Sequence, residues 1–368
     1  MRKIELYNLA IYFTIFCFAL TYADNESGLL VHGTMYSDMG LIHRVTGWDN
    51  DKFDFTGMNV LSVTMKNVKY QNSRIVGLFD LCLPYGKAIE KFTNGLSDSS
   101  GINGLINLYS FEKALLFLNI RKFYLSLYLP FVDITMGRQI INFGKGIVFS
   151  PIDVFSVIEL NDIKLRRSGS DIVSVHFPLS DLTGVDLISG LPSFDGQYSM
   201  AVKFFSSIKN FDFSLVALYR DAGHKNEIKS EVIGGVSFKG DLGIGLYSEF
   251  VGHYVINEGE TIVEIMGGID YSIRNKWIFI IEYLVKSKHF PFSIWGKNNI
   301  FGSVQYTMNE LTSINANVMY NFQYEITQGS VQWRYNLLQN VDIAFYINGI
   351  DNVSGSFLQY NLRVDVKF

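Results

Sequence analysis

Cysteine and proline are scarce in this chain of 368 residues, which holds two cysteines and six prolines. Cys17 lies in an apolar N-terminal stretch, and a chain cut after Ala23 retains only Cys82. One cysteine cannot form an intrachain disulfide, so the sequence excludes a disulfide-stapled secreted domain.

Net positive charge is absent as well. The chain has 31 lysines and arginines against 35 aspartates and glutamates, and its formal charge is −4. A mildly acidic chain has no electrostatic footprint for nucleic acid, so no nucleic-acid partner is expected. No pair of histidines or cysteines has metal-ligand spacing, and Gly144-x-Gly146 is not followed by the Gly-Lys-Ser/Thr of a phosphate loop. We therefore expect no metal and no cofactor.

Long hydrophobic runs are missing after Ala23, although 48% of the residues are hydrophobic and 15% aromatic. No stretch there approaches the roughly 18–20 apolar residues that a transmembrane helix needs. A chain of this composition must distribute its apolar residues by alternation, as transmembrane β-barrels do. The competing interpretation is a large soluble all-β protein.

The N-terminus has the three parts of a secretory signal peptide. Met1-Arg2-Lys3 is basic, 9–20 is almost wholly apolar, and Thr21-Tyr22-Ala23 supplies small residues for cleavage. The apolar run is too short for a stable transmembrane helix. Residues 1–23 are therefore the predicted signal peptide, and residues 24–368 the predicted single domain.

The C-terminal residues alternate strictly between apolar and polar. The apolar positions are Tyr360, Leu362, Val364, Val366 and Phe368. The positions between them include Arg363, so the pattern predicts a β-strand with one apolar and one charged face. A terminal aromatic residue with this spacing resembles the C-terminal signal that the barrel-assembly machinery recognises in bacterial outer-membrane barrels. The resemblance implies that the five apolar residues form the assembly signal.

Alternating segments recur through the rest of the chain. We expect strands at 28–36, 58–66, 74–83, 112–121, 131–143, 171–177, 183–190, 198–206, 211–220, 230–238, 243–253, 262–272, 277–285, 298–307, 313–322, 330–336, 341–349 and 358–368. Short connections alternate with longer ones, for example 207–210, 240–242 and 273–276. The predicted fold is all-β, a transmembrane antiparallel up-and-down β-barrel of about 18 strands, with about 16 as the alternative count.

Charge decides which face of each strand meets lipid. Arg334 shares parity with Gln332 and Asn336, whereas Val331 and Trp333 lie on the opposite face. An arginine or lysine facing lipid costs roughly 2–4 kcal/mol at the midplane, so these charged positions are expected to point inward. The sequence therefore predicts a polar interior.

The segment from Gly137-Arg138-Gln139 through Gly144 to Pro151-Ile152-Asp153 is the most distinctive in the chain. It resembles a family of uncharacterised porin-like bacterial outer-membrane β-barrels that share a Gly-Arg-Gln, aromatic-Gly, Pro-x-Asp pattern. This sequence has Phe143 where a tryptophan is commoner in that family. The resemblance implies a barrel in the outer membrane of a Gram-negative cell, surrounded by lipid, and no settled substrate.

We therefore expect a passive channel for small hydrophilic solutes, and not an enzyme. A non-conducting structural or surface-binding barrel is the first alternative. An outer-membrane hydrolase is the second, because Ser174 and His176 share one strand face. The mixed signs of the expected interior charges predict weak ion preference.

The segment 144–170 is expected to fold inward and form the constriction, because it carries charged residues beside the apolar cluster Val154, Phe155, Val157 and Ile158. Arg138 has lipid-facing parity, so we expect it either to lie near the outer rim or to be turned inward by a bulge at Gly137. The bulge is preferred, with Arg138 paired to Asp153. The predicted constriction and lumen residues are Arg138, Lys145, Asp153, Glu159, Asp162, Lys164, Arg166, Arg167, Lys203, Arg334 and Arg363.

Overall fold

A computed structural model describes residues 29–45, 53–67, 72–86, 105–110, 114–156, 167, 169–190, 198–221, 230–256, 258–288, 296–352 and 355–368. The predicted signal peptide, 1–23, lies outside the described residues. Within them, no helix is long and apolar enough to cross a membrane.

The described residues form nineteen strands, all in one sheet. Their bounds are β1 Leu29–Arg44, β2 Phe53–Asn67, β3 Ser73–Gly86, β4 Leu105–Ser110, β5 Leu115–Tyr128, β6 Asp133–Gln139, β7 Ser170–Ser180, β8 Thr183–Gly190, β9 Ser199–Ile208, β10 Phe211–Arg220, β11 Glu231–Asp241, β12 Gly245–Val255, β13 Glu260–Ile273, β14 Trp277–Lys286, β15 Asn298–Thr307, β16 Thr312–Asn321, β17 Ile326–Leu338, β18 Val341–Asn352 and β19 Gly355–Lys367.

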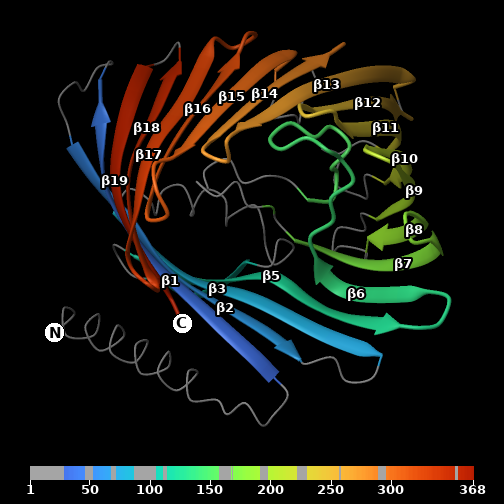
Figure 1. Cartoon of the computed structure of the whole chain (residues 1–368), viewed down its shortest axis with the longest axis horizontal. Helices are drawn as coiled ribbons and strands as arrows, with labels where there is room; N and C mark the ends of the chain where they lie inside the picture. Colours follow the sequence, from blue (N-terminus) through green and yellow to red (C-terminus); the bar gives the residue numbers. More distant parts are fainter. Residues whose placement is uncertain are drawn as a thin grey trace.

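Eighteen of these strands close into a barrel (Figure 1). Each pairs antiparallel with its neighbours, β3 pairs directly with β5, and β19 returns to β1. The remaining strand, β4, pairs with β5 alone. The predicted all-β barrel of about 18 strands is therefore confirmed, although β4 falls where a loop was expected.

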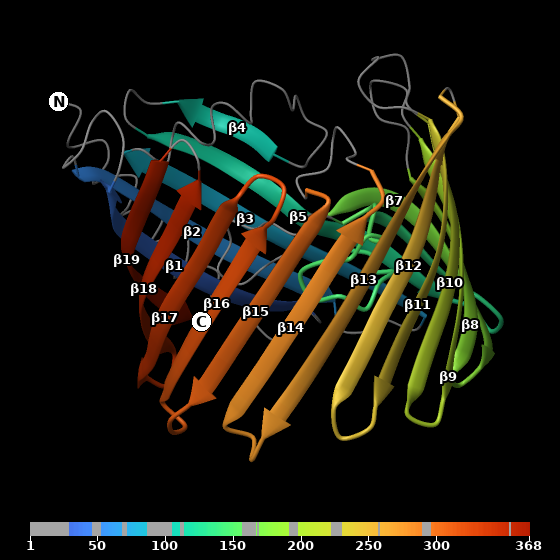
Figure 2. The same ribbon diagram turned by 90° about the horizontal axis from the view of Figure 1, so that it is seen from above.

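Short turns and long connections lie at opposite ends of the barrel (Figure 2). The turns at 209–210, 242–244, 274–276, 308–311 and 339–340 join consecutive strands at one end, which we call the short-turn end. Lys209, Arg274 and Asn275 have positive φ angles there, as tight hairpins require. The longest connections, including 140–169, leave from the other end, the long-loop end. The up-and-down topology follows from this alternation.

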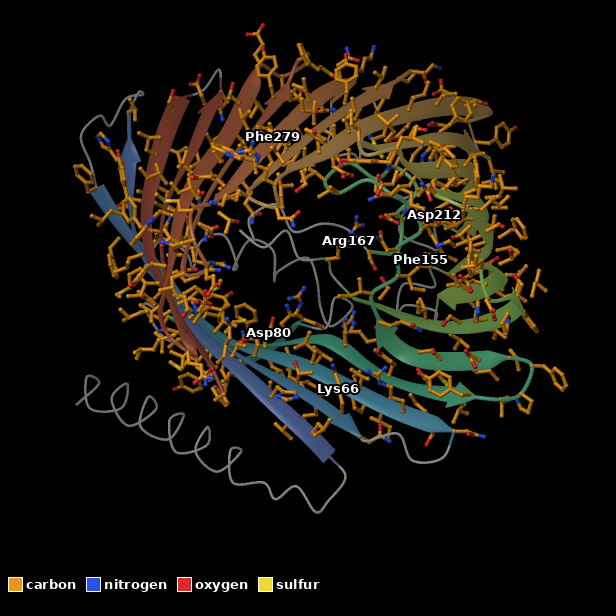
Figure 3. All side chains as sticks on the ribbon, viewed as in Figure 1. Lys66, Asp80, Phe155, Arg167, Asp212 and Phe279 are labelled. Carbon is orange, nitrogen blue, oxygen red and sulfur yellow. The ribbon has the colours of Figure 1, made fainter. Side chains whose placement is uncertain are left out.

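The outer wall is apolar, as the alternation predicts. On β10, Phe213 and Leu215 are 41% and 52% exposed, whereas Ser214 between them is 1% exposed. On β17, Val331 and Trp333 are exposed in the same way. Apolar side chains thus project outward around the ring (Figure 3). This is the arrangement that a barrel surrounded by hydrocarbon requires.

The barrel closes at a seam between β1 and β19. Asp38 and Arg363 lie directly opposite each other across this seam, and Arg363 Nε donates to Asp38 Oδ1 at 2.8 Å. A second hydrogen bond joins Arg363 Nη2 to Asp38 Oδ2. Beyond the end of β19, Phe368 exchanges two backbone hydrogen bonds with Gly33, at 2.8 and 2.9 Å. The last residue of the chain therefore continues the pairing that closes the sheet.

Candidate functional site

The segment 140–156 between β6 and β7 lies inside the ring (Figure 1). Phe143 and Ile152 pack on interior-facing side chains of β7 to β12, and Val148 and Phe149 pack on those of β12 to β15. Figure 3 places Phe155 within the ring as well, and Val154 and Phe155 are half-buried against the first cluster. Val157 and Ile158, which were expected in the same apolar cluster, lie outside the described residues.

Apolar side chains line much of the interior wall beneath the inward segment, where the sequence predicted polar ones. Val216, Leu218, Ile233 and Val251 point inward and are buried beneath the segment. The expectation of a polar interior is therefore wrong at these positions, although Ser214, Glu249 and Glu282 lie on the same part of the wall. A chain segment that folds into a barrel needs apolar side chains beneath it, because its own apolar residues would otherwise face water.

Glu282, on β14, holds residues 147–149, which we call the tip of the segment. Its Oε2 accepts the backbone N–H of Val148 at 2.9 Å and of Phe149 at 2.8 Å. Its Oε1 accepts the N–H of Ile147 at 2.5 Å and the hydroxyl of Tyr247 at 2.9 Å. The glutamate is 0% exposed, so its charge is balanced by these four donors and not by water.

Glu249, on β12, holds the preceding turn in the same manner. Its Oε1 accepts the N–H of Lys145 at 2.7 Å and of Gly146 at 2.8 Å, and the Ser150 hydroxyl lies 3.1 Å from both of its oxygens. A Cβ at Gly144 would lie 2.3 Å from Glu249 Oε1. The glycine at 144 is therefore needed for the close approach of backbone to carboxylate, and not for a phosphate.

Asp153 organises the segment from within. Its Oδ1 accepts the N–H of Phe143 at 2.5 Å and of Gly144 at 2.9 Å, while its Oδ2 pairs with Arg167 Nη1 at 2.5 Å. Arg167 also donates to the carbonyl of Ser156 at 3.1 Å. One buried carboxylate thus joins the start of the segment to the residues that lead back to the wall.

A β-bulge turns an arginine inward on β5. Leu78 lies opposite Lys122 and Phe79 opposite Ile120, so no residue of β3 lies opposite Arg121 in the strand register. Arg121 is buried, lies 3.8 Å from Asp80 on β3, and donates to the carbonyl of Arg167 at 2.9 Å. This bulge ties the wall on the β3–β5 side to the inward segment.

Charged groups of both signs flank the segment. Lys145 Nζ lies 3.7 Å from Asp212 on β10, and Lys203 Nζ donates to the carbonyl of Asn142 at 3.3 Å. On β11, directly opposite Asp212, Lys239 lies 3.7 Å from Asp270. Figure 3 shows Arg167 projecting into the ring with Asp212 on the wall. Positive and negative groups are therefore interleaved, with no ring of one sign among the described residues.

The preferred prediction for Arg138, a bulge at Gly137 and a pair with Asp153, is wrong in both respects. The register of β6 with β5 and β7 is continuous, so no bulge occurs at Gly137, although that glycine has a φ of 122°. Arg138 pairs with Asp171, its direct neighbour on β7, at 3.3 Å and not with Asp153. Its side chain is 7% exposed and lies one residue from the end of β6, at the long-loop end. The prediction that β6 continues to Phe143 is also wrong, because the chain turns inward after Gln139.

The other predicted site residues fall into three groups. Lys145 and Asp153 belong to the inward segment, and Arg167 and Lys203 contact it, whereas Arg363 is buried in the seam with Asp38. Arg334 lies on β17, opposite Ser313 and Ala344. The remaining four, Glu159, Asp162, Lys164 and Arg166, lie outside the described residues. The sequence analysis missed the role of Glu249 and Glu282 as anchors, because that role depends on contacts with the distant segment 140–156.

The residues expected to form the assembly signal are all in or next to β19. Leu362 and Val366 are exposed on the outer wall, and Val364, Tyr360 and Phe368 are partly exposed. These exposures agree with the outward face that the alternation assigns to them.

The pair considered for hydrolysis does not form a nucleophile and base. His176 Nδ1 lies 2.6 Å from Asp186 Oδ1, and its ring stacks on Phe205 with centroids 5.8 Å apart. Ser174 Oγ accepts a hydrogen bond from Gln139 Nε2 at 3.4 Å. Among the described residues, no group of three or more His, Cys, Asp or Glu is placed to hold a metal ion. The interior offers hydrogen bonds and charges to a solute, without an assembled reacting centre in this part of the chain.

Known proteins resemble this chain in fold and not in sequence. No known family and no curated protein matches the chain in sequence. Among solved structures, it is similar to Acinetobacter baumannii OccAB4, with 10% identity, a TM-score of 0.58, and coverage of 94% of this chain and 100% of that one. A BenF-like porin from Pseudomonas fluorescens Pf-5 gives 9% identity and a TM-score of 0.60, with coverage of 92% and 98%. Pseudomonas aeruginosa OccK9 (OpdG) gives 9% and 0.59, with the same coverage. At these identities the likeness shows a shared barrel fold.

Proposed function

We propose that this protein is a channel of the bacterial outer membrane through which small hydrophilic solutes diffuse passively. The observation that carries the proposal is the segment 140–156, which is clamped inside an eighteen-stranded barrel by buried Glu249 and Glu282. Barrels of this size enclose an aqueous space, so a segment fixed inside narrows the passage and leaves the wall intact.

The segment covers only one side of the interior. Inward-facing residues of β10 to β14, such as Ser214, Glu249 and Met266, are buried. Inward-facing residues of β15 to β17, such as Asn315 and Gln332, remain partly exposed. A solute would therefore pass between the clamped segment and the exposed inward side chains of β15 to β17, and selection would depend on pore diameter and lining charges without a chemical step.

The proposed constriction comprises Lys145 and Asp153 of the segment, Arg167 and Lys203, which contact it, and Glu159, Asp162, Lys164 and Arg166 in the adjoining chain. Arg334 and Arg363 belong to the wall, Arg363 through its pair with Asp38. Arg138, beside Asp171 at the long-loop end, is left out of the constriction.

A location in the outer membrane implies two further partners, lipid and the barrel-assembly machinery. Outer-membrane lipid would contact the exposed apolar wall, and residues 1–23 would direct export. The barrel-assembly machinery would recognise β19 through Phe368 and the outward residues before it. The Pseudomonas fluorescens protein that shares this fold is a BenF-like porin, and this likeness supports a channel.

The alternatives make different use of the same barrel. A non-conducting barrel would act through its long connections. A hydrolase would need Ser174 to be activated, but its hydroxyl is paired with Gln139 and not with His176. A channel explains why a segment is fixed inside the barrel, because the segment narrows the passage. Neither alternative requires a segment in that place.

Single-channel recording on the purified full-length protein in planar lipid bilayers tests the proposal. We expect discrete conductance steps, and a larger step when 149–165 is replaced by a Gly/Ser linker, because Asp153 and the adjoining constriction residues 159, 162 and 164 are then removed. Faster migration of the unheated protein on a detergent gel identifies the folded barrel in both samples. Absence of conductance by the folded protein would overturn the channel, and unchanged conductance in the folded replacement variant would place the segment outside the constriction.

A further inference from the structure

Six neutral side chains cover adjacent inward positions on three neighbouring strands, and we call them the amide panel. They are Ser303, Gln305, Asn315, Asn317, Ser330 and Gln332. The pairing register joins Gln305, Asn315 and Gln332 in one row across β15, β16 and β17, and Ser303, Asn317 and Ser330 in the next. Every member carries an amide or a hydroxyl, and none carries a charge.

The panel lies beside the clamped segment. Phe301, two residues before Ser303, is buried against Val148 and Phe149, and Met319, two residues after Asn317, packs on the same cluster. Since residues two apart on a strand share a face, the panel begins one row from the tip of the segment. A solute that passes the tip must therefore pass over the panel.

The hydrogen-bonding capacity of the panel is largely unused. All six residues are partly exposed. Asn317 Nδ2 donates to Asn315 Oδ1 at 3.5 Å, which is a long hydrogen bond. Among the described residues, the buried Gln332 Nε2 has no hydrogen-bond partner, so this donor is unused, while the side chain as a whole is partly exposed. Each primary amide offers two donors and one acceptor oxygen, so the panel presents donors and acceptors side by side.

We propose that the amide panel is a binding surface for neutral polyhydroxylated solutes of monosaccharide to disaccharide size. This inference rests on the channel proposed above and names the substrate class of that channel. Hydroxyl groups donate and accept, so they match a surface of amides and hydroxyls. Neighbouring strands lie about 4.8 Å apart, so three strands span about 10 Å, the length of a small sugar.

Charged solutes are disfavoured on the same surface. Removing a charge from water requires an opposite charge or several good hydrogen bonds in return, and the panel has no opposite charge to offer. Arg334 follows Gln332 by two residues on β17, so it lies one row closer to the short-turn end, opposite Ser313 on β16. Because Arg334 carries a positive charge, an anion is the competing solute. The experiment must therefore distinguish uptake of an anion from uptake of a neutral solute.

Uptake of radiolabelled glucose, gluconate and glucosamine into proteoliposomes tests the proposal, since the three probes have similar size and different charge. The wild-type protein is expected to admit glucose at least about fivefold faster than either ion, the factor that one net hydrogen bond supplies. Replacing both Gln332→Leu and Asn317→Leu should remove this preference while the KCl conductance stays close to that of the wild type.

Thr135→Val provides the matched control. Thr135 faces the interior from β6, on another part of the wall, and its hydroxyl pairs with Ser126 at 2.9 Å. This variant should keep the preference for glucose. If the paired replacement fails to fold on the unheated gel, the single variant Asn315→Leu gives the same comparison. Conductance with equal uptake of all three probes, or with faster uptake of gluconate, would overturn the panel and leave the channel intact. Absence of conductance would overturn the channel itself.

Discussion

Phe149 and Glu282 lie 133 residues apart in the sequence and are joined by a hydrogen bond of 2.8 Å from the backbone N–H to the buried carboxylate. Phe149 is itself 0% exposed, so both partners of this contact are removed from water. The barrel wall therefore fixes the position of the inward segment through its backbone, and the side chains of the segment remain available for packing.

Glu282→Gln is expected to loosen the tip of the segment. The amide keeps the shape of the side chain but replaces an acceptor oxygen with a donor, which faces backbone N–H groups. A hydrogen bond to a charged group contributes about 1.5–3 kcal/mol, so losing one or two would free the segment part of the time. Single-channel records should show added current fluctuations and a larger mean conductance than the wild type.

Glu260→Gln is the control for this substitution, because Glu260 forms an exposed ion pair with Lys288 at 3.2 Å. An exposed pair contributes little to stability, so the control channel should behave as the wild type. Records of Glu282→Gln that match those of the control would show that the carboxylate does not hold the segment.

The strand pattern could be predicted because each strand has one face toward apolar surroundings and one toward the interior. This contrast leaves a period of two in residues such as Val331, Gln332 and Trp333. The strand β4 could not be predicted, since it pairs with β5 alone and lies beyond the closed ring. The inward turn after Gln139 was missed because Ile141 and Phe143 continue the alternation while packing inside the barrel.

The site was predicted in part. The segment carries apolar residues and charges together, and this signal is local in the sequence. Its anchors are not local, because Glu249 accepts from Lys145 across 104 positions and no pattern links the two. The bulge at Arg121 was missed for the same reason, since it is visible only in the pairing of β3 with β5. The wrong pairing of Arg138 with Asp153 assumed such a bulge one strand later.

Asp38→Asn is expected to weaken the seam that closes the barrel. Arg363 is 4% exposed in its side chain and makes two hydrogen bonds to the Asp38 carboxylate. Removing one partner of a buried ion pair typically costs about 3–5 kcal/mol, because the other charge is left uncompensated. The temperature at which the folded band converts to the unfolded band on a detergent gel should fall.

Lys367→Met is the comparison for the seam. Lys367 Nζ lies 2.9 Å from Asp342 Oδ2, but the lysine side chain is 55% exposed. Its loss should move the conversion temperature far less than Asp38→Asn does. Equal shifts for the two variants would contradict a special role for the buried pair.

Gly33→Leu is expected to hinder closure at the C-terminus. A Cβ at position 33 would lie 2.0 Å from Cε2 of Phe368, so the terminal ring lies directly over this glycine. The larger side chain must displace the ring and disturb the two backbone hydrogen bonds between these residues. The fraction of folded protein after refolding into lipid vesicles, read from an unheated gel, should decrease.

Two further variants identify the cause of that decrease. Gly267→Ala places a Cβ where nothing lies within 4 Å, so it should fold as the wild type does. Combining Gly33→Leu with Phe368→Ala removes the clash and should recover part of the folded fraction. A combined variant that folds no better than Gly33→Leu alone would show that contact with the ring is not the cause.

Weak ion selectivity is expected from the pairing of charges inside the barrel. Lys145 faces Asp212 at 3.7 Å, and Lys239 faces Asp270 at the same distance. Because these two cations each have an anion beside them, their fields largely cancel, and the potassium-to-chloride permeability ratio should stay below about 10 in either direction.

Substituting one member of a pair tests this cancellation. Asp212→Asn leaves Lys145 without its 3.7 Å partner, so the reversal potential in a KCl gradient should move toward the chloride value. Lys145→Met removes the cation of the same pair and should move it toward the potassium value. Shifts of opposite sign follow only if both side chains face the permeating ions, because a pair screened from the passage would leave the reversal potential unchanged in both variants. A wild-type ratio above about 10 would instead show that an unbalanced set of charges controls the passage.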